Sequence, residues 1–332
     1  MSDIECVKLS VLFVCYKQES QVEAALRSIL AQNYPNLEII VSDDASPDGT
    51  FAVLEKVVQG YQGPHRVILS RNVHNLGVGG NIARAVSLSS GELLFIAAGD
   101  DISVPHRCSR VAQAWDQTGR QVDLIASTLI DMDAAGQLHG VIRPSALHEL
   151  RSPEDWVRHR PHVVGAAQAW TRRAYDHFGP LPQGVVAEDL VMVFRAICLG
   201  GALSIDEPLV QYRRGGLSGR VRAMDAQEVI RRLLSNNRHA LVESELMLAD
   251  ARKAGCSPDV MACLEREWRL ARWIDALFHK RAGWQRLQML WQASEPAWGQ
   301  RVRLWVYAAC PAVMAPFFAL KRAVSRRKAK RA

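Results

Sequence analysis

The 332-residue chain lacks the cysteine patterns that mark a disulfide framework or a zinc site. Its seven cysteines are scattered through the sequence, with no Cys-x-x-Cys and no histidine pair at zinc spacing. No basic segment followed by an apolar stretch opens the chain, so we expect no cleavable signal peptide. Both absences favour buried, reduced thiols and a cytoplasmic protein.

The two commonest phosphate-binding glycine motifs are also absent. A glycine-rich turn contains Asn75, Gly77, Gly79, Gly80 and Asn81. It matches neither Gly-x-Gly-x-x-Gly nor Gly-x-x-x-x-Gly-Lys-Ser/Thr, so the sequence offers no dinucleotide-binding fingerprint and no Walker P-loop. These residues are as consistent with a plain tight turn that opens a helix as with a ligand-binding turn.

Positive charge is in excess at one end only. The net charge is +7, and residues 321–332 contain seven Lys or Arg and no acidic residue. The rest of the chain carries 34 basic and 34 acidic residues. We therefore expect no broad basic face for nucleic acid.

The segment before this tail is uncharged. Residues 304–320 contain four aromatic residues and two prolines. An apolar segment followed by a polybasic end favours a helix that lies on the inner face of the cytoplasmic membrane, with peripheral contact through 304–331. A helical bundle with a solvated tail explains the same pattern.

Apolar runs and helical spacings alternate through the first hundred residues. The runs at 9–15, 38–42, 66–69 and 93–98 are typical of buried strands, and apolar residues recur at helical spacing between them. Strands separated by helices predict parallel βαβ units, and hence an α/β fold with a Rossmann-like, mostly parallel sheet flanked by helices. After Gly219 the pattern is almost entirely helical.

Pairs of acidic residues follow two of these strands. Asp43-Asp44 ends the second strand, and Asp100-Asp101 follows the fourth. The carboxyl ends of parallel strands share one edge, where open α/β sheets bind ligands. Adjacent carboxylates repel each other unless a cation lies beside them, and hard divalent cations commonly bridge carboxylates to phosphates. The pattern predicts a metal–diphosphate site, with a solvated acidic turn as the plainer alternative.

Over about residues 8–220 the motifs together resemble the family 2 glycosyltransferases of GT-A fold. The resemblance rests on runs that occur in order and at fitting spacings: Tyr16-Lys-Gln-Glu, Gln32-Asn-Tyr, Glu38-Ile-Ile-Val-Ser-Asp-Asp-Ala-Ser-Pro-Asp-Gly-Thr, Asn75-Leu-Gly, Gly91-Glu, Ala98-Gly-Asp-Asp, Glu188-Asp189 and Tyr212-Arg213 before Gly215-Gly-Leu-Ser. It implies a GT-A nucleotide-sugar-binding catalytic domain at 1–220, a helical extension at 221–300, and an apolar amphipathic segment with the polybasic tail at 301–332.

The resemblance also implies a role for each matching residue on the donor side. Tyr16 and Glu19 would line the nucleotide-base pocket, and Asp44 would hydrogen-bond the base. Asp100 would lie near the ribose or the donor sugar. Arg213 would belong to a region that closes over the donor phosphates.

Two further roles concern the chemistry itself. Asp101 would ligate Mg²⁺ or Mn²⁺ on the diphosphate, and Asp189 would be the catalytic base, although acids at a helix start also favour the helix dipole. The family's metal motif often reads Asp-x-Asp-Asp, whereas Ala98 occupies its first position here.

The sequence therefore predicts an inverting, metal-dependent glycosyltransferase. It would move a sugar from a nucleotide-diphosphate-sugar to a hydroxyl of a glycan or lipid-linked acceptor, in bacterial surface polysaccharide or lipopolysaccharide assembly. A nucleotidyltransferase would have a similar sheet and a similar carboxylate-bound metal ion. However, residues 10–20 lack the glycine-rich, basic loop that binds a triphosphate in such enzymes. A catalytically silent nucleotide-binding scaffold is the other alternative, motivated by Ala98.

Overall fold

The computed structural model describes residues 6–214, 226–280, 283–292, 296–310 and 313. Most of the predicted membrane-contact segment 304–331, together with the polybasic tail, lies outside these residues. The chain divides into two compact units, Met1–Gly216 with Ala249–Val260, and Leu217–Leu248 with Met261–Ala332. Within the described residues, no helix combines the length and the apolar character needed to cross a bilayer.

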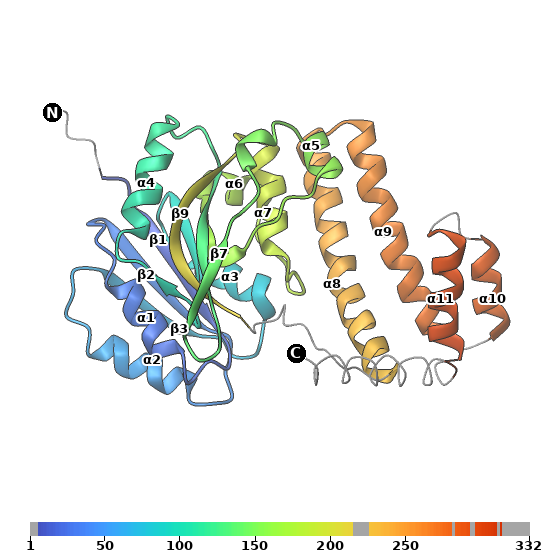
Figure 1. The fold of residues 1–332 in the computed structure, drawn as a ribbon, viewed down its shortest axis with the longest axis horizontal. Helices are drawn as coiled ribbons and strands as arrows, with labels where there is room; N and C mark the ends of the chain where they lie inside the picture. Colours follow the sequence, from blue (N-terminus) through green and yellow to red (C-terminus); the bar gives the residue numbers. More distant parts are fainter. Residues whose placement is uncertain (1–5, 215–225, 281–282, 293–295, 311–312, 314–332) are drawn as a thin grey trace. The chain divides into compact units, whose positions relative to one another are not determined.

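The first unit is built on one mixed sheet with the order β3-β2-β1-β4-β8-β6-β9-β5, in which β7 also pairs with β6 (Figure 1). Its parallel half confirms the predicted α/β fold and consists of β1 (Leu9–Cys15), β2 (Leu37–Asp43), β3 (Arg66–Arg71) and β4 (Leu93–Ala98). The βαβ connections come from α1 (Val22–Leu30), α2 (Thr50–Gln59) and α3 (Gly77–Ser87).

β1, β2 and β4 are buried on both faces, which explains why they are largely apolar runs, whereas the edge strand β3 is partly exposed. Val11 and Phe13 of β1 join a core cluster with residues of α1, α2 and α4 (Arg107–Gln117). Leu12 is fully buried on the opposite face, and Ile82 of α3 is also fully buried. Two polar side chains within these strands are hydrogen-bonded to each other, because the hydroxyl of Ser10 donates to Oε1 of Glu38 at 2.7 Å.

The second half of the sheet is less regular than the first. β8 (Gln168–Thr171) runs antiparallel between β4 and β6 (Leu124–Met132), and β6 pairs in parallel with β9 (Ala202–Arg213). The short strand β5 (Ile102–Ser103) and the hairpin strand β7 (Leu138–Ile142) complete it. β9 runs as far as Arg213, whose side chain contacts the loop after β4.

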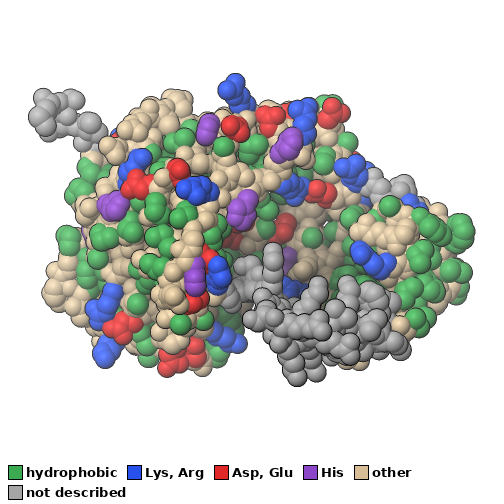
Figure 2. Space-filling model, viewed as in Figure 1, with side chains coloured by type: hydrophobic (Ala, Val, Ile, Leu, Met, Phe, Trp, Pro, Cys, Tyr) green, Lys and Arg blue, Asp and Glu red, His purple; other side chains and the backbone are tan. Residues whose placement is uncertain are grey.

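Short helices cover this half of the sheet: η1 (Leu147–Glu149), α5 (Pro153–Arg158), η2 (Gly165–Ala167), α6 (Arg172–Phe178) and α7 (Glu188–Ile197). The second unit is helical, and its helices are α8 (Ala226–Lys253), α9 (Pro258–His279), α10 (Gly283–Gln292) and α11 (Trp298–Ala309). The last turn of α8 and the start of α9 belong to the first unit. Figure 2 shows hydrophobic side chains gathered over α10 and α11.

Candidate active site

Three neighbouring strands end together at one edge of the sheet. Cys15 of β1 pairs with Asp43 of β2, and Val14 pairs with Ala98 of β4. The loops that follow these strands are therefore adjacent, as expected for the carboxyl ends of parallel strands. Gly99 permits the close approach, because a Cβ there would lie 2.6 Å from Cβ of Cys15.

Asp101 is the most perturbed acid at this edge. Its Oδ1 accepts a hydrogen bond of 2.8 Å from the backbone N–H of Arg213, whereas its buried Oδ2 has no hydrogen-bond partner among the described residues. Burial, followed by the charge of Asp100, raises the pKa of Asp101 to about 8. A buried carboxylate oxygen without a donor, next to a second carboxylate, fits a hard divalent cation.

The protein supplies few ligands for such a cation. In the part of the chain that the structure describes, no three His, Cys, Asp or Glu residues converge into a group that could hold a metal ion. The end of β4 carries Ala98 where a further acid would stand in the longer motif. A cation at Asp101 would therefore depend on oxygen ligands from a bound diphosphate.

Arg213 lies beside the acid pair, as its place at the end of β9 requires. Its Nε donates to the backbone oxygen of Asp100 at 3.2 Å. Its Nη1 donates to the backbone oxygens of Asp133 and Ala134 at 3.1 and 3.2 Å. The positive charge of Arg213 opposes the burial that raises the pKa of Asp100. Arg213 thus holds the loop after β4 in place, and its guanidinium group adds positive charge beside that loop.

Asp44 fastens the glycine-rich turn. Its carboxylate accepts from the backbone N–H groups of Leu76 and Gly77 at 2.8 and 2.9 Å and from Nδ2 of Asn72 at 2.9 Å. The turn needs glycine at Gly77, where φ is +73°. Since an ionised carboxylate has about four acceptor positions, Asp44 retains capacity for one more donor.

The loop after β1 is held by the turn after β2. Ser46 Oγ accepts from the backbone N–H of Lys17 at 3.0 Å, and Thr50 Oγ1 accepts from that of Gln18 at 2.9 Å. Glu19 Oε2 reciprocates by accepting from Gly49 N–H at 2.9 Å. Tyr16 remains 40% exposed, with Nζ of Lys17 5.1 Å from the centroid of its ring, so that a planar ligand could stack on the ring's other face.

Asp189 stands in the first turn of α7, and its Oδ1 accepts from the backbone N–H of Leu190 at 2.8 Å. Gln168, at the start of β8, donates through Nε2 to the backbone oxygen of Asp189 at 3.3 Å. β8 pairs antiparallel with β4, so Gln168 lies toward the carboxyl end of β4. Gly165 of η2 leaves room for the carboxylate of Glu188, because a Cβ there would overlap it.

Sequence reasoning missed Arg107, a fully buried guanidinium behind the acid pair. It donates to Ile96 O at 2.8 Å, to Ser103 Oγ at 3.1 Å and to Gln168 O at 3.4 Å, and so joins β4, β5 and β8. Burial lowers the pKa of Arg107 to about 10, and the charge of Asp101 opposes that shift. A positive charge at the start of a helix is unfavourable beside the helix dipole. The position of Arg107 at the start of α4 was therefore the one sequence signal that it has another role.

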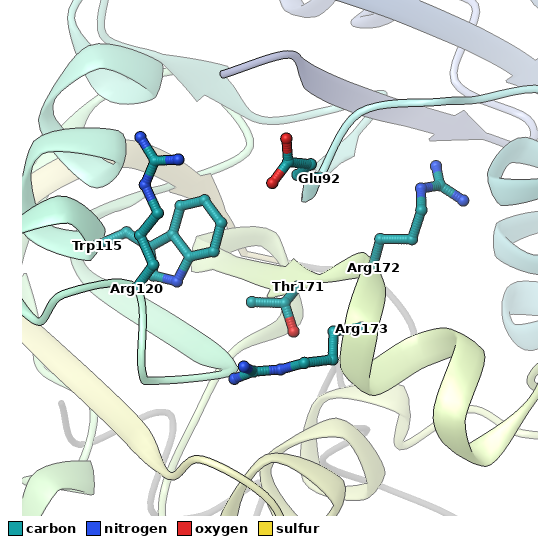
Figure 3. Close-up of a pocket in the computed structure, with 6 residues that line it drawn as sticks. All are labelled: Glu92, Trp115, Arg120, Thr171, Arg172 and Arg173. Carbon is teal, nitrogen blue, oxygen red and sulfur yellow. The ribbon is translucent and has the colours of Figure 1, made fainter. Parts of the chain in front are cut away.

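A cavity of about 390 Å³ lies away from these residues (Figure 3), lined by Glu92, Trp115, Arg120, Thr171, Arg172 and Arg173. Glu92 precedes β4 and Thr171 ends the antiparallel β8, so this cavity lies at the opposite edge of the sheet. Its arginines hold strand ends: Arg173 pairs with Asp123 at 2.9 Å, and Arg172 donates to Gly91 O at 2.8 Å.

Part of the chain matches a known protein family. Residues 10–170 match the family model described as "Glycosyl transferase family 2". EpsE from Bacillus subtilis (strain 168) is 29% identical over 138 residues, which is 42% of this chain and 49% of EpsE. WfaP from Escherichia coli, named as a UDP-Glc:alpha-D-GlcNAc-diphosphoundecaprenol beta-1,3-glucosyltransferase, is 28% identical over 101 residues, 30% of this chain and 38% of WfaP. The chain spans half or less of these relatives' lengths.

Similarity in fold extends over nearly the whole chain. TarS 1-349 from S. aureus in complex with UDP superimposes with a TM-score of 0.54 at 15% identity, over 95% of this chain and 87% of that one. TarS 1-349 in complex with UDP-GlcNAc gives a TM-score of 0.52 at 17% identity, over 97% and 92%. At this identity the likeness establishes the fold, a mixed sheet with flanking and C-terminal helices.

Proposed function

Because residues 10–170 place this chain in glycosyltransferase family 2, we propose that it transfers a sugar from a nucleotide-diphosphate-sugar to an acceptor hydroxyl. The observation that carries the proposal is the buried Oδ2 of Asp101, which has no hydrogen-bond partner among the described residues and lies at the edge where open α/β sheets bind ligands. Such an oxygen is costly unless a cation or a ligand completes it.

The donor would lie across the loops after β1, β2 and β4. Tyr16, Glu19 and Asp44 would form the base pocket, with the exposed Tyr16 ring stacking on the base. Asp100 would face the ribose or the sugar. Arg213, whose Nε donates to the backbone oxygen of Asp100, would contribute positive charge near the diphosphate.

Asp101, with the donor diphosphate, would hold Mg²⁺ or Mn²⁺. When bound, the cation neutralises charge that develops on the leaving diphosphate. Asp189 would take the proton from the acceptor hydroxyl, whose oxygen attacks the anomeric carbon as the bond to the diphosphate oxygen breaks. With one base and a direct displacement, the anomeric configuration inverts.

The setting we propose is bacterial surface polysaccharide or lipopolysaccharide assembly on the inner face of the cytoplasmic membrane. WfaP is named for a diphosphoundecaprenol-linked acceptor, which supports a glycan or lipid-linked acceptor for this chain. Such an acceptor would make peripheral membrane contact through 304–331 useful, because the reacting hydroxyl would lie near the bilayer surface.

The experiment measures release of nucleoside diphosphate from UDP-, GDP- and dTDP-sugars with Mn²⁺ and a lipid-diphosphate acceptor. We expect Asp189→Asn to lower kcat by about 10²–10⁴-fold with little change in donor binding, because it removes the general base. Asp101→Asn should instead abolish the Mn²⁺-dependent thermal shift that the donor produces. Asp176→Asn, an exposed acid on α6, is the matched control and should behave as wild type.

The alternatives give different results in the same assay. Full transfer activity in Asp189→Asn would disprove the base assignment. A wild-type protein that binds a nucleotide-sugar but turns over no donor would be a silent scaffold. Release of pyrophosphate from a nucleoside triphosphate would identify a nucleotidyltransferase.

A further inference from the structure

Tryptophan is concentrated in α10 and α11, and three of the four tryptophans there are exposed, whereas Trp305 is partly buried. Trp284, Trp291, Trp298 and Trp305 follow one another at intervals of seven residues. The first three are 68%, 73% and 48% exposed. Tryptophan is a highly buried residue on average, so three exposed rings within two short helices need a partner.

These rings lie on one face of each helix. Trp284, Leu287 and Trp291 occupy positions i, i+3 and i+7 of α10, which fall on a single helical stripe. Leu287 is also exposed, at 49%, whereas Leu290 of the same helix is buried. Hence α10 buries one side within the unit and presents its tryptophan stripe outward.

The same arrangement occurs on α11, where Trp298 and Val302 are exposed at i and i+4 and Leu304 is buried. The two stripes meet, because the rings of Trp291 and Trp298 lie with their centroids 5.0 Å apart. We call Trp284, Leu287, Trp291, Trp298 and Val302 the tryptophan face.

Hydrogen bonds between the two helices hold this surface in place. Arg286 of α10 donates to Ala308 O at 2.7 Å, and Arg301 of α11 donates to Leu290 O at 3.3 Å. The tryptophan face therefore belongs to a braced helix pair, and Figure 2 shows hydrophobic side chains over these helices.

The charge around the face selects its partner. Residues 280–310 contain five basic residues and one acidic residue: Lys280, Arg281, Arg286, Arg301, Arg303 and Glu295. Tryptophan prefers the boundary between hydrocarbon and water, and basic residues beside it attract anionic headgroups. A neutral glycan would gain nothing from the positive charge, and a second copy of this chain would meet like charge.

We propose that the tryptophan face is a membrane-docking surface for anionic phospholipid. This inference rests on the proposed function and deepens it, since it assigns membrane contact to 284–302 in addition to the segment 304–331. The indole rings enter the headgroup boundary, while the excess positive charge of this segment attracts the anionic headgroups. Docking would bring the enzyme to a lipid-linked acceptor.

The test compares full-length proteins in co-sedimentation with vesicles of phosphatidylcholine alone or mixed with phosphatidylglycerol. We expect wild type to sediment with the anionic vesicles. A triple variant with Trp284→Ser, Trp291→Ser and Trp298→Ser should bind them at least about tenfold more weakly, because the apolar contact is lost. The control carries Leu138→Ser and Val141→Ser, which remove exposed apolar side chains from β7 and should change nothing.

Several outcomes would overturn the docking surface. Equal sedimentation of the triple variant and wild type would show that the indole rings make no contact with lipid. A wild type that does not sediment with anionic vesicles would exclude docking altogether. A wild-type dimer that the triple variant converts to a monomer, without vesicle binding, would identify a second copy as the occupant. Retention on a glycan matrix in place of vesicles would identify a carbohydrate.

Nucleoside diphosphate release without vesicles separates this inference from the proposed function. We expect the triple variant to keep wild-type release, which also shows that it folds. A wild type that sediments but releases nothing from any donor removes the proposed function and leaves the docking surface. A wild type that turns over donor but does not sediment removes the docking surface alone.

Discussion

The buried ion pair between Arg195 and Asp250 offers the sharpest test of what holds α7 in place. Arg195 is fully buried, and its Nε and Nη2 donate to the two carboxylate oxygens of Asp250 at 2.7 and 3.3 Å. Nη1 donates to Gly179 O at 2.8 Å. The pair joins α7, which begins with Glu188-Asp189, to the last turn of α8.

Asp250→Ala should destabilise the protein strongly. It removes two charge-assisted hydrogen bonds and leaves a buried guanidinium with its charge uncompensated, a loss of about 3–5 kcal/mol. For a unit of this size that corresponds to a fall in Tm of roughly 6–20 °C. The measurement is the free energy of unfolding in urea, with Tm as the second observable.

The chain contains a matched exposed pair for comparison. Arg120 Nε lies 2.7 Å from Asp116 Oδ1, the same distance as in the buried pair, but both side chains are more than a third exposed. Asp116→Ala should cost less than about 1 kcal/mol, because solvent screens the attraction. Equal losses for the two variants would refute the argument from burial.

Replacing both partners should behave differently from removing one. Burial raises the pKa of Asp250, and the hydrogen bond from Arg195 opposes that shift. The cost of removing two charges from water can equal or exceed the attraction between them. A variant with Arg195→Met and Asp250→Leu should therefore recover most of the stability lost in Asp250→Ala. A double variant as unstable as the single one would show that the pair stabilises the fold on balance.

Three more predictions concern the sheet and its edge. Gly91→Ala should lower the free energy of unfolding by about 1–3 kcal/mol, because its Cβ would lie 2.6 Å from the Leu9 carbonyl carbon, whereas Gly140→Ala, with open space around it, should not. Burial raises the Glu38 pKa, but hydrogen bonds from neighbouring groups outweigh it and lower the pKa from 4.5 to about 2. Because the folded pKa is depressed, Glu38 contributes stability above its unfolded pKa that is lost as the pH falls from 4.5 toward 2. Urea unfolding across that range should show up to about 3 kcal/mol less acid sensitivity in Glu38→Gln. A chelator should abolish donor turnover and Mn²⁺ should restore it in wild type but not in Asp101→Asn, whereas turnover that survives chelation would argue against a metal.

Local patterns were enough to predict the parallel half of the sheet. β1 to β4 are short apolar runs separated by amphipathic helices, and such units have few possible arrangements. The acidic pairs at Asp43-Asp44 and Asp100-Asp101 follow from the same reasoning, because parallel strands end at one edge. No comparable local period marks β8, whose insertion between β4 and β6 depends on pairing between distant segments.

The individual contacts at the site were beyond the reach of sequence patterns. The glycine-rich turn was open to two interpretations, and only the folded chain brings the carboxylate of Asp44 onto the N–H groups of Leu76 and Gly77. Likewise, only the folded chain brings the hydroxyl of Ser46 onto the backbone N–H of Lys17 in the loop after β1. Each of these bonds joins residues about 30 positions apart, which no local pattern records.

By itself, the sequence carried the resemblance to a family through its ordered motifs. It also determined the α/β architecture and the edge of the sheet where acids gather, because short-range periodicity and strand direction carry that information. Tertiary structure alone decided that Asp101 has a buried oxygen without a donor among the described residues, that Arg107 lies behind it, and that Trp284, Trp291 and Trp298 face outward. Burial and long-range hydrogen bonding depend on how distant segments pack, and a linear pattern holds no record of that packing.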